Sequence, residues 1–278
     1  MYARKVLTSC LLSLACCVSI YAQGYTGNLT FVQASSNLAF SGDLSFPPLG
    51  IPFTPFTAQA GPPAPPASMT TSYTGTVNIT IDLTTGAIVF NGASAVAAIS
   101  GNWTPDALLT LAPGPANYGI NHAGTGTTAA IRNLSMTMTS GYLALTGGPG
   151  SYNFGSTQTL AYLPGGSLDY NSSLLGAAHS PLSGSVANTN PTAGTLTNLG
   201  NGSFTLSLPF DAKSLITSSG VTIGHTDLNG TLFATGTLVA IPEPTTYALI
   251  GLSLGMAGYF SYRHKKRLKN LEEQKVVV

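Results

Sequence analysis

Alternation of apolar and polar side chains restricts the fold of this 278-residue chain more than any other feature. In the stretch TGTVNITIDL, which starts at Thr74, the residues Val77, Ile79 and Ile81 alternate with polar residues. This period of two is typical of a strand with one buried face. The next residues, TTG, turn the chain into AIVFNG, and the two runs are predicted to form a hairpin.

The same alternation recurs further along the chain, and Gly or Asn separates the runs. Strands are predicted within IRNLSMTMT, GYLALTG, GSFTLSLPFD and LNGTLFATGTLVA. The body, residues 24–240, keeps no helical period over three turns and is predicted to be all-β. Gly-rich turns between short strands favour an antiparallel β-sandwich, with a barrel as the alternative. Residues 46–68, with eight prolines, and residues 187–202 are predicted to be surface loops.

Charge is scarce in the body and excludes one class of function. Between residues 24 and 241 the basic residues are Arg132 and Lys213, against six aspartates, which gives a net charge of 2 − 6 = −4. Nucleic-acid binding needs clustered Lys and Arg, so no nucleic-acid partner is expected. All three cysteines precede residue 18, so the body has neither disulfides nor thiol chemistry.

The amino end has the layout of a secretory signal peptide. Arg4 and Lys5 precede an apolar stretch, and small residues follow it. We predict a signal peptide at residues 1–22, cleaved after Ala22, and hence an exported protein. Acylation of Cys16 or Cys17, as in a lipoprotein, is disfavoured because the residue at the start of SLAC is a serine where leucine is expected.

The carboxyl end is predicted to be a membrane anchor. Residues 247–262 are apolar or small, and as a helix they would extend roughly 24–27 Å, enough for a thin bilayer core. A basic cluster would hold the end of this helix on the cytoplasmic side, leaving the body outside. The cluster consists of Arg263, Lys265, Lys266, Arg267 and Lys269.

The triplet Pro242, Glu243 and Pro244, the apolar run and the basic cluster together resemble the sorting signal of the PEP-CTERM family. The resemblance covers residues 241–269 and leaves residues 270–278 as a polar tail. It implies an exosortase, a membrane peptidase that cuts near the triplet, and a host that makes exopolysaccharide. The two prolines favour an extended backbone, which suits recognition by a peptidase.

The body offers few candidates for metal binding or catalysis. His122, His179 and His225 lie more than forty residues apart, and we interpret them as satisfied surface or loop residues. A calcium ion held by Asp169 and Asn171 is the alternative to an ordinary turn there. The body has no Glu and no Gly-x-Ser-x-Gly motif. The sequence therefore predicts no metal, no cofactor and no catalytic residues.

These observations predict an exported, non-enzymatic protein, anchored in the cell envelope or released from it. Its expected role is structural or adhesive, in an extracellular matrix or in association with exopolysaccharide. The alternatives are a secreted enzyme that acts on polysaccharide and a sugar-binding module. A cleft in which two aspartates converge, or in which a histidine meets an aspartate, would favour the enzyme.

Overall fold

The computed structural model describes residues 24–46, 49–59, 65–105, 111–174, 176–218, 221–241, 251–256 and 258–263, together with residue 266. The chain divides into two compact units. One is the body, Tyr25–Val239, and the other combines Met1–Gly24 with Ala240–Val278. The predicted signal peptide, with its cleavage site after Ala22, lies outside the described residues.

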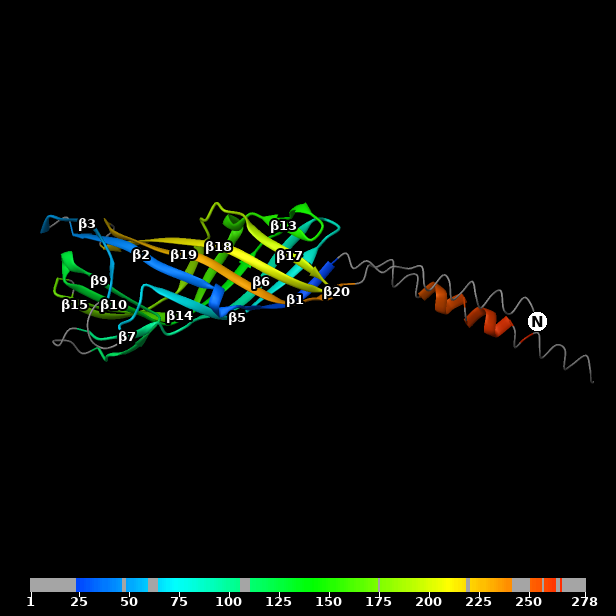
Figure 1. The fold of residues 1–278 in the computed structure, drawn as a ribbon, viewed down its shortest axis with the longest axis horizontal. Helices are drawn as coiled ribbons and strands as arrows, with labels where there is room; N and C mark the ends of the chain where they lie inside the picture. Colours follow the sequence, from blue (N-terminus) through cyan, green and yellow to red (C-terminus); the bar gives the residue numbers. More distant parts are fainter. Residues whose placement is uncertain are drawn as a thin grey trace, which may run out of the picture. The chain divides into compact units, whose positions relative to one another are not determined.

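Antiparallel strands make up most of the body (Figure 1), and the predicted all-β, antiparallel class is confirmed. The strands are β1 (Gly24–Phe31), β2 (Asn37–Phe46), β3 (Ile51–Pro55), β4 (Thr57–Ala58), β5 (Thr70–Asp82), β6 (Ala87–Ala97), β7 (Gly101–Trp103), β8 (Gly114–Ala116), β9 (Tyr118–His122), β10 (Thr127–Ser140), β11 (Leu143–Ala144), β12 (Thr146–Gly148), β13 (Ser151–Phe154), β14 (Thr159–Ser172), β15 (Gly176–Pro181), β16 (Gly184–Ala187), β17 (Gly194–Gly200), β18 (Ser203–Ser218), β19 (Val221–Thr237) and β20 (Val239–Ile241). Among the described residues, the short 3₁₀ turns η1 (Gln33–Ser35), η3 (Ala123–Thr125) and η4 (Ser156–Gln158) connect some of them.

The predicted hairpin between β5 and β6 is confirmed. The two strands pair from Tyr73–Ala97 to Asp82–Ala87, and the alternating residues Val77, Ile79 and Ile81 are fully buried. Asp82 stabilises the turn, because its Oδ1 accepts hydrogen bonds from the next backbone amides, Thr84 N at 2.8 Å and Thr85 N at 3.1 Å. Period-two alternation thus correctly indicated which face is buried.

The two predicted loops are corrected in part. The Pro-rich segment 46–68 contains β3, which pairs with β2, and β4, which pairs with β9. Short strands near a sheet edge tolerate proline, which explains why its presence did not prevent pairing. The segment 187–202 contains β17, which pairs with both β13 and β18. The fully buried Leu196 fixes the face of β17 despite its polar neighbours.

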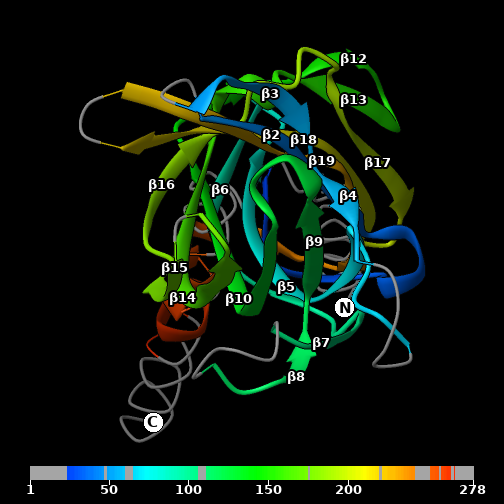
Figure 2. The ribbon, with the colours of Figure 1, turned by 90° about the vertical axis from the view of Figure 1, so that its left-hand side faces the viewer.

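The strand pairings of the body form a closed ring (Figure 2). From β18 the ring passes through β19 to β2 and β1, then to β5, β6, β10, β14 and β16. Just after β16, Asn188 bridges Ala212 of β18 and completes the ring. The barrel alternative therefore describes this pairing better than two separate packed sheets.

Inward-facing residues of the ring form the main core. Fully buried members include Leu29, Leu38, Tyr73, Ile79, Leu208 and Leu232. A smaller cluster lies under the β7–β8 hairpin, where the fully buried Trp103 packs against three small residues, Ala67, Ala116 and Ala130.

In the second unit, residues 251–256 and 258–263 are helical. Within the portion of the chain that the structure describes, no helix combines the length and the apolar character needed to cross a membrane. Part of the predicted anchor, residues 247–250 and 257, lies outside that portion. Membrane anchoring remains a prediction.

Candidate functional site

Neighbouring strands β2, β19 and β18 carry charged residues around a groove of about 640 Å³ on the body. The register between the strands explains why these charged residues lie together, because His225 lies opposite Asp43 and Asp227 lies opposite Lys213. Phe53, from β3, also lines the groove, and its ring lies 5.2 Å from the imidazole of His225. Alternation in β19 places His225 and Asp227 on the same face.

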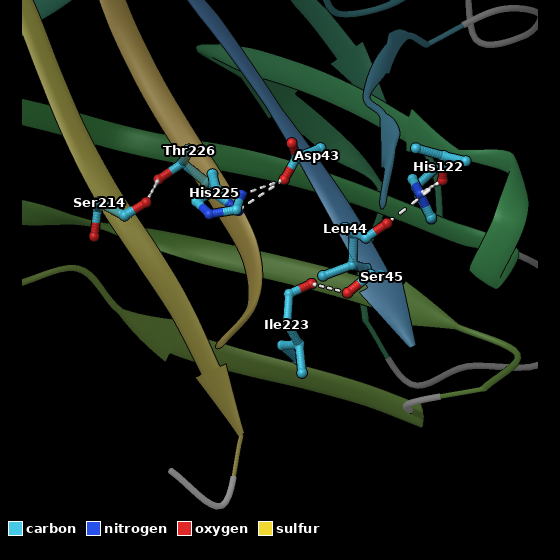
Figure 3. A network of polar contacts seen from close by, with 9 residues as sticks. Asp43, Leu44, Ser45, His122, Ser214, Ile223, His225 and Thr226 are labelled. Carbon is cyan, nitrogen blue, oxygen red and sulfur yellow. Dashed lines mark hydrogen bonds and ion pairs between the residues drawn. The ribbon is translucent and has the colours of Figure 1, made fainter. Parts of the chain in front are cut away.

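His225 and Asp43 form an ion pair or hydrogen bond, with Nδ1 and Oδ1 2.7 Å apart (Figure 3). The backbone N–H of His225 donates to the same oxygen at 3.1 Å. A carboxylate on Nδ1 orients an imidazole for general-base chemistry at Nε2. Within the described residues, no hydrogen bond joins this Nε2 to a hydroxyl or thiol. The pair is half-exposed, so water has access to it.

Asp211 and Asp227 share a hydrogen bond beside Lys213, whose Nζ lies 3.1 Å from Asp211 Oδ2. Burial acts against ionisation of Asp211, but hydrogen bonds from Asp227, Lys213 and Thr189 lower its pKa overall. Burial, followed by the hydrogen bond and charge of Asp211, raises the pKa of Asp227. Asp227 is therefore the more readily protonated of the two carboxyl groups.

The separation of these carboxyl groups constrains their chemistry. Two carboxyl groups with divergent pKa values are a pattern of acid–base catalysis. Glycosidases, however, hold their two carboxyl groups about 5–9.5 Å apart, to admit the sugar or a water molecule. The side chains of Asp211 and Asp227 interact with each other, which is a closer arrangement than that of a glycosidase pair.

A second charged group lies on β10, β14 and β15. Asp169 forms an ion pair with Arg132, with Oδ2 and Nε 3.2 Å apart, and its Oδ1 lies 2.5 Å from His179 Nδ1. The guanidinium of Arg132 also lies 5.0 Å from the ring centre of Trp103. Asp169, considered above for calcium, is thus bound by two nitrogen-bearing side chains. Over the described ranges, no three His, Cys, Asp or Glu side chains are grouped so as to hold a metal.

The predicted surface or loop placement is wrong for His122, which is only 1% exposed. Its Nδ1 lies 2.7 Å from Thr125 Oγ1 and accepts from the Thr125 N–H at 3.2 Å, and its Nε2 contacts Thr54. Burial lowers the pKa of this imidazole, against the opposing effect of its hydrogen bonds. His122 is therefore a neutral, satisfied residue of the interior.

The pairing of His225 with Asp43, and of His179 with Asp169, was missed at the level of sequence. The second pair is directly cross-strand in the β14–β15 hairpin, and recognition of that turn would have predicted it. The first pair spans 182 positions, and no local pattern indicates it.

The residues of the predicted sorting signal are only partly described. Arg263 and Lys266 are helical, whereas Pro242, Glu243, Pro244, Lys265, Arg267 and Lys269 lie outside the described residues.

Comparison with curated proteins and with solved structures gives no match. A family model does match the carboxyl end, over residues 240–267, and confirms the resemblance found there. This motif indicates an exported, sorted protein and implies an exosortase-type peptidase as its processing partner. The chain therefore carries, at residues 240–267, a PEP-CTERM protein-sorting motif.

Proposed function

We propose that the protein is a non-enzymatic component of the cell envelope or extracellular matrix, in which it has a structural or adhesive role next to exopolysaccharide. The sorting motif supports the placement. In this proposal the carboxyl-terminal helix tethers the body outside the membrane until the exosortase cuts near Pro242–Pro244. The body is then retained by, or released into, the matrix.

A ladder of amide and hydroxyl groups on β1, β5 and β6 is the observation that carries this role. Asn91 Nδ2 donates to Asn78 Oδ1 at 2.9 Å and to Thr80 Oγ1 at 2.9 Å. Asn78 Nδ2 in turn donates to Asn28 Oδ1 at 2.9 Å. Asn28 and Asn78 have further donor and acceptor capacity, and Asn91 has further acceptor capacity at its Oδ1. A fixed array of neutral polar groups suits contact with sugar hydroxyls and has no group capable of bond cleavage.

Binding of the purified mature protein to exopolysaccharide from its host tests this role. We expect the protein to cosediment with the polysaccharide, and the double variant Asn78→Ala/Asn91→Ala to cosediment less. Asn153→Ala, on an exposed position of β13, is the matched control and should bind as the wild type does. Equal binding by all three proteins would show that the ladder is not part of the surface that contacts the polysaccharide.

Mass spectrometry of the protein isolated from its host tests the processing. Peptides that end near the triplet are the expected result, together with loss of those peptides in a host that lacks the exosortase. An intact stretch of residues 245–278 would contradict cleavage and leave the anchor standing.

The second candidate function is hydrolysis of polysaccharide in the groove around Asp43 and His225. The 2.7 Å contact between this carboxylate and imidazole favours it, because such pairs activate water. Release of reducing ends from the host polysaccharide by the wild type, together with its loss in both Asp43→Asn and His225→Asn, would establish the enzyme. Absence of any release by the wild type would favour the non-enzymatic role.

A further inference from the structure

An apolar cavity of about 360 Å³ lies inside one end of the closed sheet. Its walls come from six strands and from the segment between β3 and β4, and include Phe40, Phe56, Ile120, Leu168, Ile216 and Ile223. Phe56 is held at the edge of the cavity because its N–H donates to Gly42 O at 2.8 Å. A Cβ at Gly42 would lie 2.8 Å from the Phe56 ring, so glycine is needed for this approach.

A second cavity of about 280 Å³ adjoins the first, and Phe40 and Thr226 line both. On β10 the lining passes from Thr127 in the first cavity to Met136 in the second. At about 3.3 Å per residue this path extends on the order of 25–30 Å along the strand. The combined space is therefore long and narrow, which suits a linear chain better than a ring system.

His122 and Thr226, two of the polar side chains that line this space, already have partners. His122 is bound on both ring nitrogens by Thr54 and Thr125, and burial keeps its imidazole neutral. Thr226 Oγ1 donates to Ser214 O at 3.4 Å. Asn121 also lines the first cavity, and its buried Oδ1 has no partner among the described residues. The rest of the lining is mostly apolar, which favours an aliphatic ligand over a sugar.

Tyr170 is another polar residue on the wall of the first cavity. Its ring lines the first cavity, and among the described residues its hydroxyl has no hydrogen-bond partner. Protein interiors rarely contain apolar voids much larger than a water molecule, whereas ligand sites of about 300–1,000 Å³ with mostly apolar walls and few polar groups are common. Closed sheets of about eight strands hold single small ligands in this way.

We propose that the closed sheet binds one fatty acid, with its aliphatic chain in the two adjoining cavities and its carboxylate at the Tyr170 hydroxyl. This binding site is independent of the polysaccharide contact proposed above, because that contact uses the outer face of β1, β5 and β6. The protein would then carry a lipid while it is attached to, or released from, the envelope.

Titration of the delipidated, full-length mature protein with palmitic acid, followed by displacement of a fluorescent fatty acid, tests the proposal. The expected result is saturable binding of one palmitate per chain. Ala129→Trp fills the first cavity, where Ala129 is buried, and should weaken binding at least tenfold. Val96→Trp, at an outward position that is 46% exposed, is the matched control and should bind as the wild type does.

Tyr170→Phe keeps the ring and its packing, and therefore tests the site even where Ala129→Trp does not fold. It should weaken palmitate binding several-fold and leave binding of the uncharged hexadecane unchanged. No saturable binding of palmitate by the wild type would overturn the proposal. So would equal affinity in a folded Ala129→Trp, or equal palmitate affinity in Tyr170→Phe.

Discussion

Replacement of Asn188 with alanine should destabilise the body at the point where its sheet closes. The Asn188 side chain is buried and forms four hydrogen bonds. Its Nδ2 donates to Pro209 O at 2.9 Å and to Thr159 Oγ1 at 3.2 Å. Its Oδ1 accepts from the backbone N–H groups of Asn190 and Asp211, both at 3.0 Å. One amide thus ties the end of β16 to both β14 and β18.

The magnitude follows from the groups that the substitution leaves unpaired. Three of the four partners are backbone groups, and each buried group without a partner costs about 1–3 kcal/mol. Ala187 and Thr189 on either side are exposed, so water can replace part of the loss. We expect the free energy of unfolding to fall by about 2–4 kcal/mol. For a body of this size that lowers the melting temperature by about 5–15 °C.

Thermal and urea unfolding, followed by circular dichroism, measure this change. Asn91→Ala is the matched control, since Asn91 is exposed and its amide bonds only to side chains; it should cost less than about 1 kcal/mol. Faster hydrogen exchange of the Asp211 amide should accompany Asn188→Ala. A melting temperature for Asn188→Ala no lower than that of the control would refute the closure argument.

Three further predictions concern other positions in the body. Gly75→Ala should lower the free energy of unfolding, measured in urea, by about 2 kcal/mol or more, because φ at Gly75 is +115° and the added Cβ would lie 1.6 Å from Ser94 O. The control Gly141→Ala has open space around the added Cβ and should change the free energy of unfolding little. Burial raises the pKa of Tyr73 and Tyr118 above the ordinary 10.0, so the unfolded chain loses these protons first. Stability should therefore fall above about pH 10, by up to about 1.4 kcal/mol per pH unit for each ring, and Tyr118→Phe should halve that slope in alkaline unfolding. Burial lowers the pKa of His122 below the ordinary 6.5, so as the pH falls the unfolded chain binds this proton before the folded chain does. The free energy of unfolding should therefore decrease as the pH falls below about 6.5. If it decreases as steeply with pH in His122→Asn as in the wild type, this prediction is wrong.

Features that depend on local pattern were predictable from the sequence, and those that depend on distant pairing were not. Val77, Ile79 and Ile81 indicate their own burial through their spacing, and the β5–β6 turn lies a few residues away. Closure at Asn188 depends on how β16 aligns with β18, which no short stretch encodes. The prolines of β3 concealed a strand, because proline excludes only positions where the N–H is needed.

The candidate groove and the sorting motif differ in the same way, because the groove depends on distant pairing and the motif on local sequence. Asp and His are common in turns and on surfaces, so neither Asp43 nor His225 is conspicuous in the sequence. Only the antiparallel register of β2 and β19 brings Asp43 Oδ1 and His225 Nδ1 to within 2.7 Å of each other. The sorting motif, by contrast, was identified from the sequence because its residues are contiguous in the chain. Linear signals are visible in a sequence, whereas sites assembled across strands appear only once the register is known.

Many small exported domains are stabilised by disulfides, but the body of this protein contains no cysteine. The hydrogen bonds of Asn188 connect the closing strands instead. Asn188 and Ala212 lie directly opposite each other across an antiparallel bridge. Such pairs have Cα atoms about 4.5–5.5 Å apart, within the roughly 4.4–6.8 Å that a disulfide requires. The double variant Asn188→Cys/Ala212→Cys should therefore be as unstable as Asn188→Ala when reduced. Oxidation should recover about 3–3.5 kcal/mol, the value for closing a loop of this length. If covalent closure does not raise the melting temperature above that of the reduced form, the closing bridge does not limit the stability of the sheet.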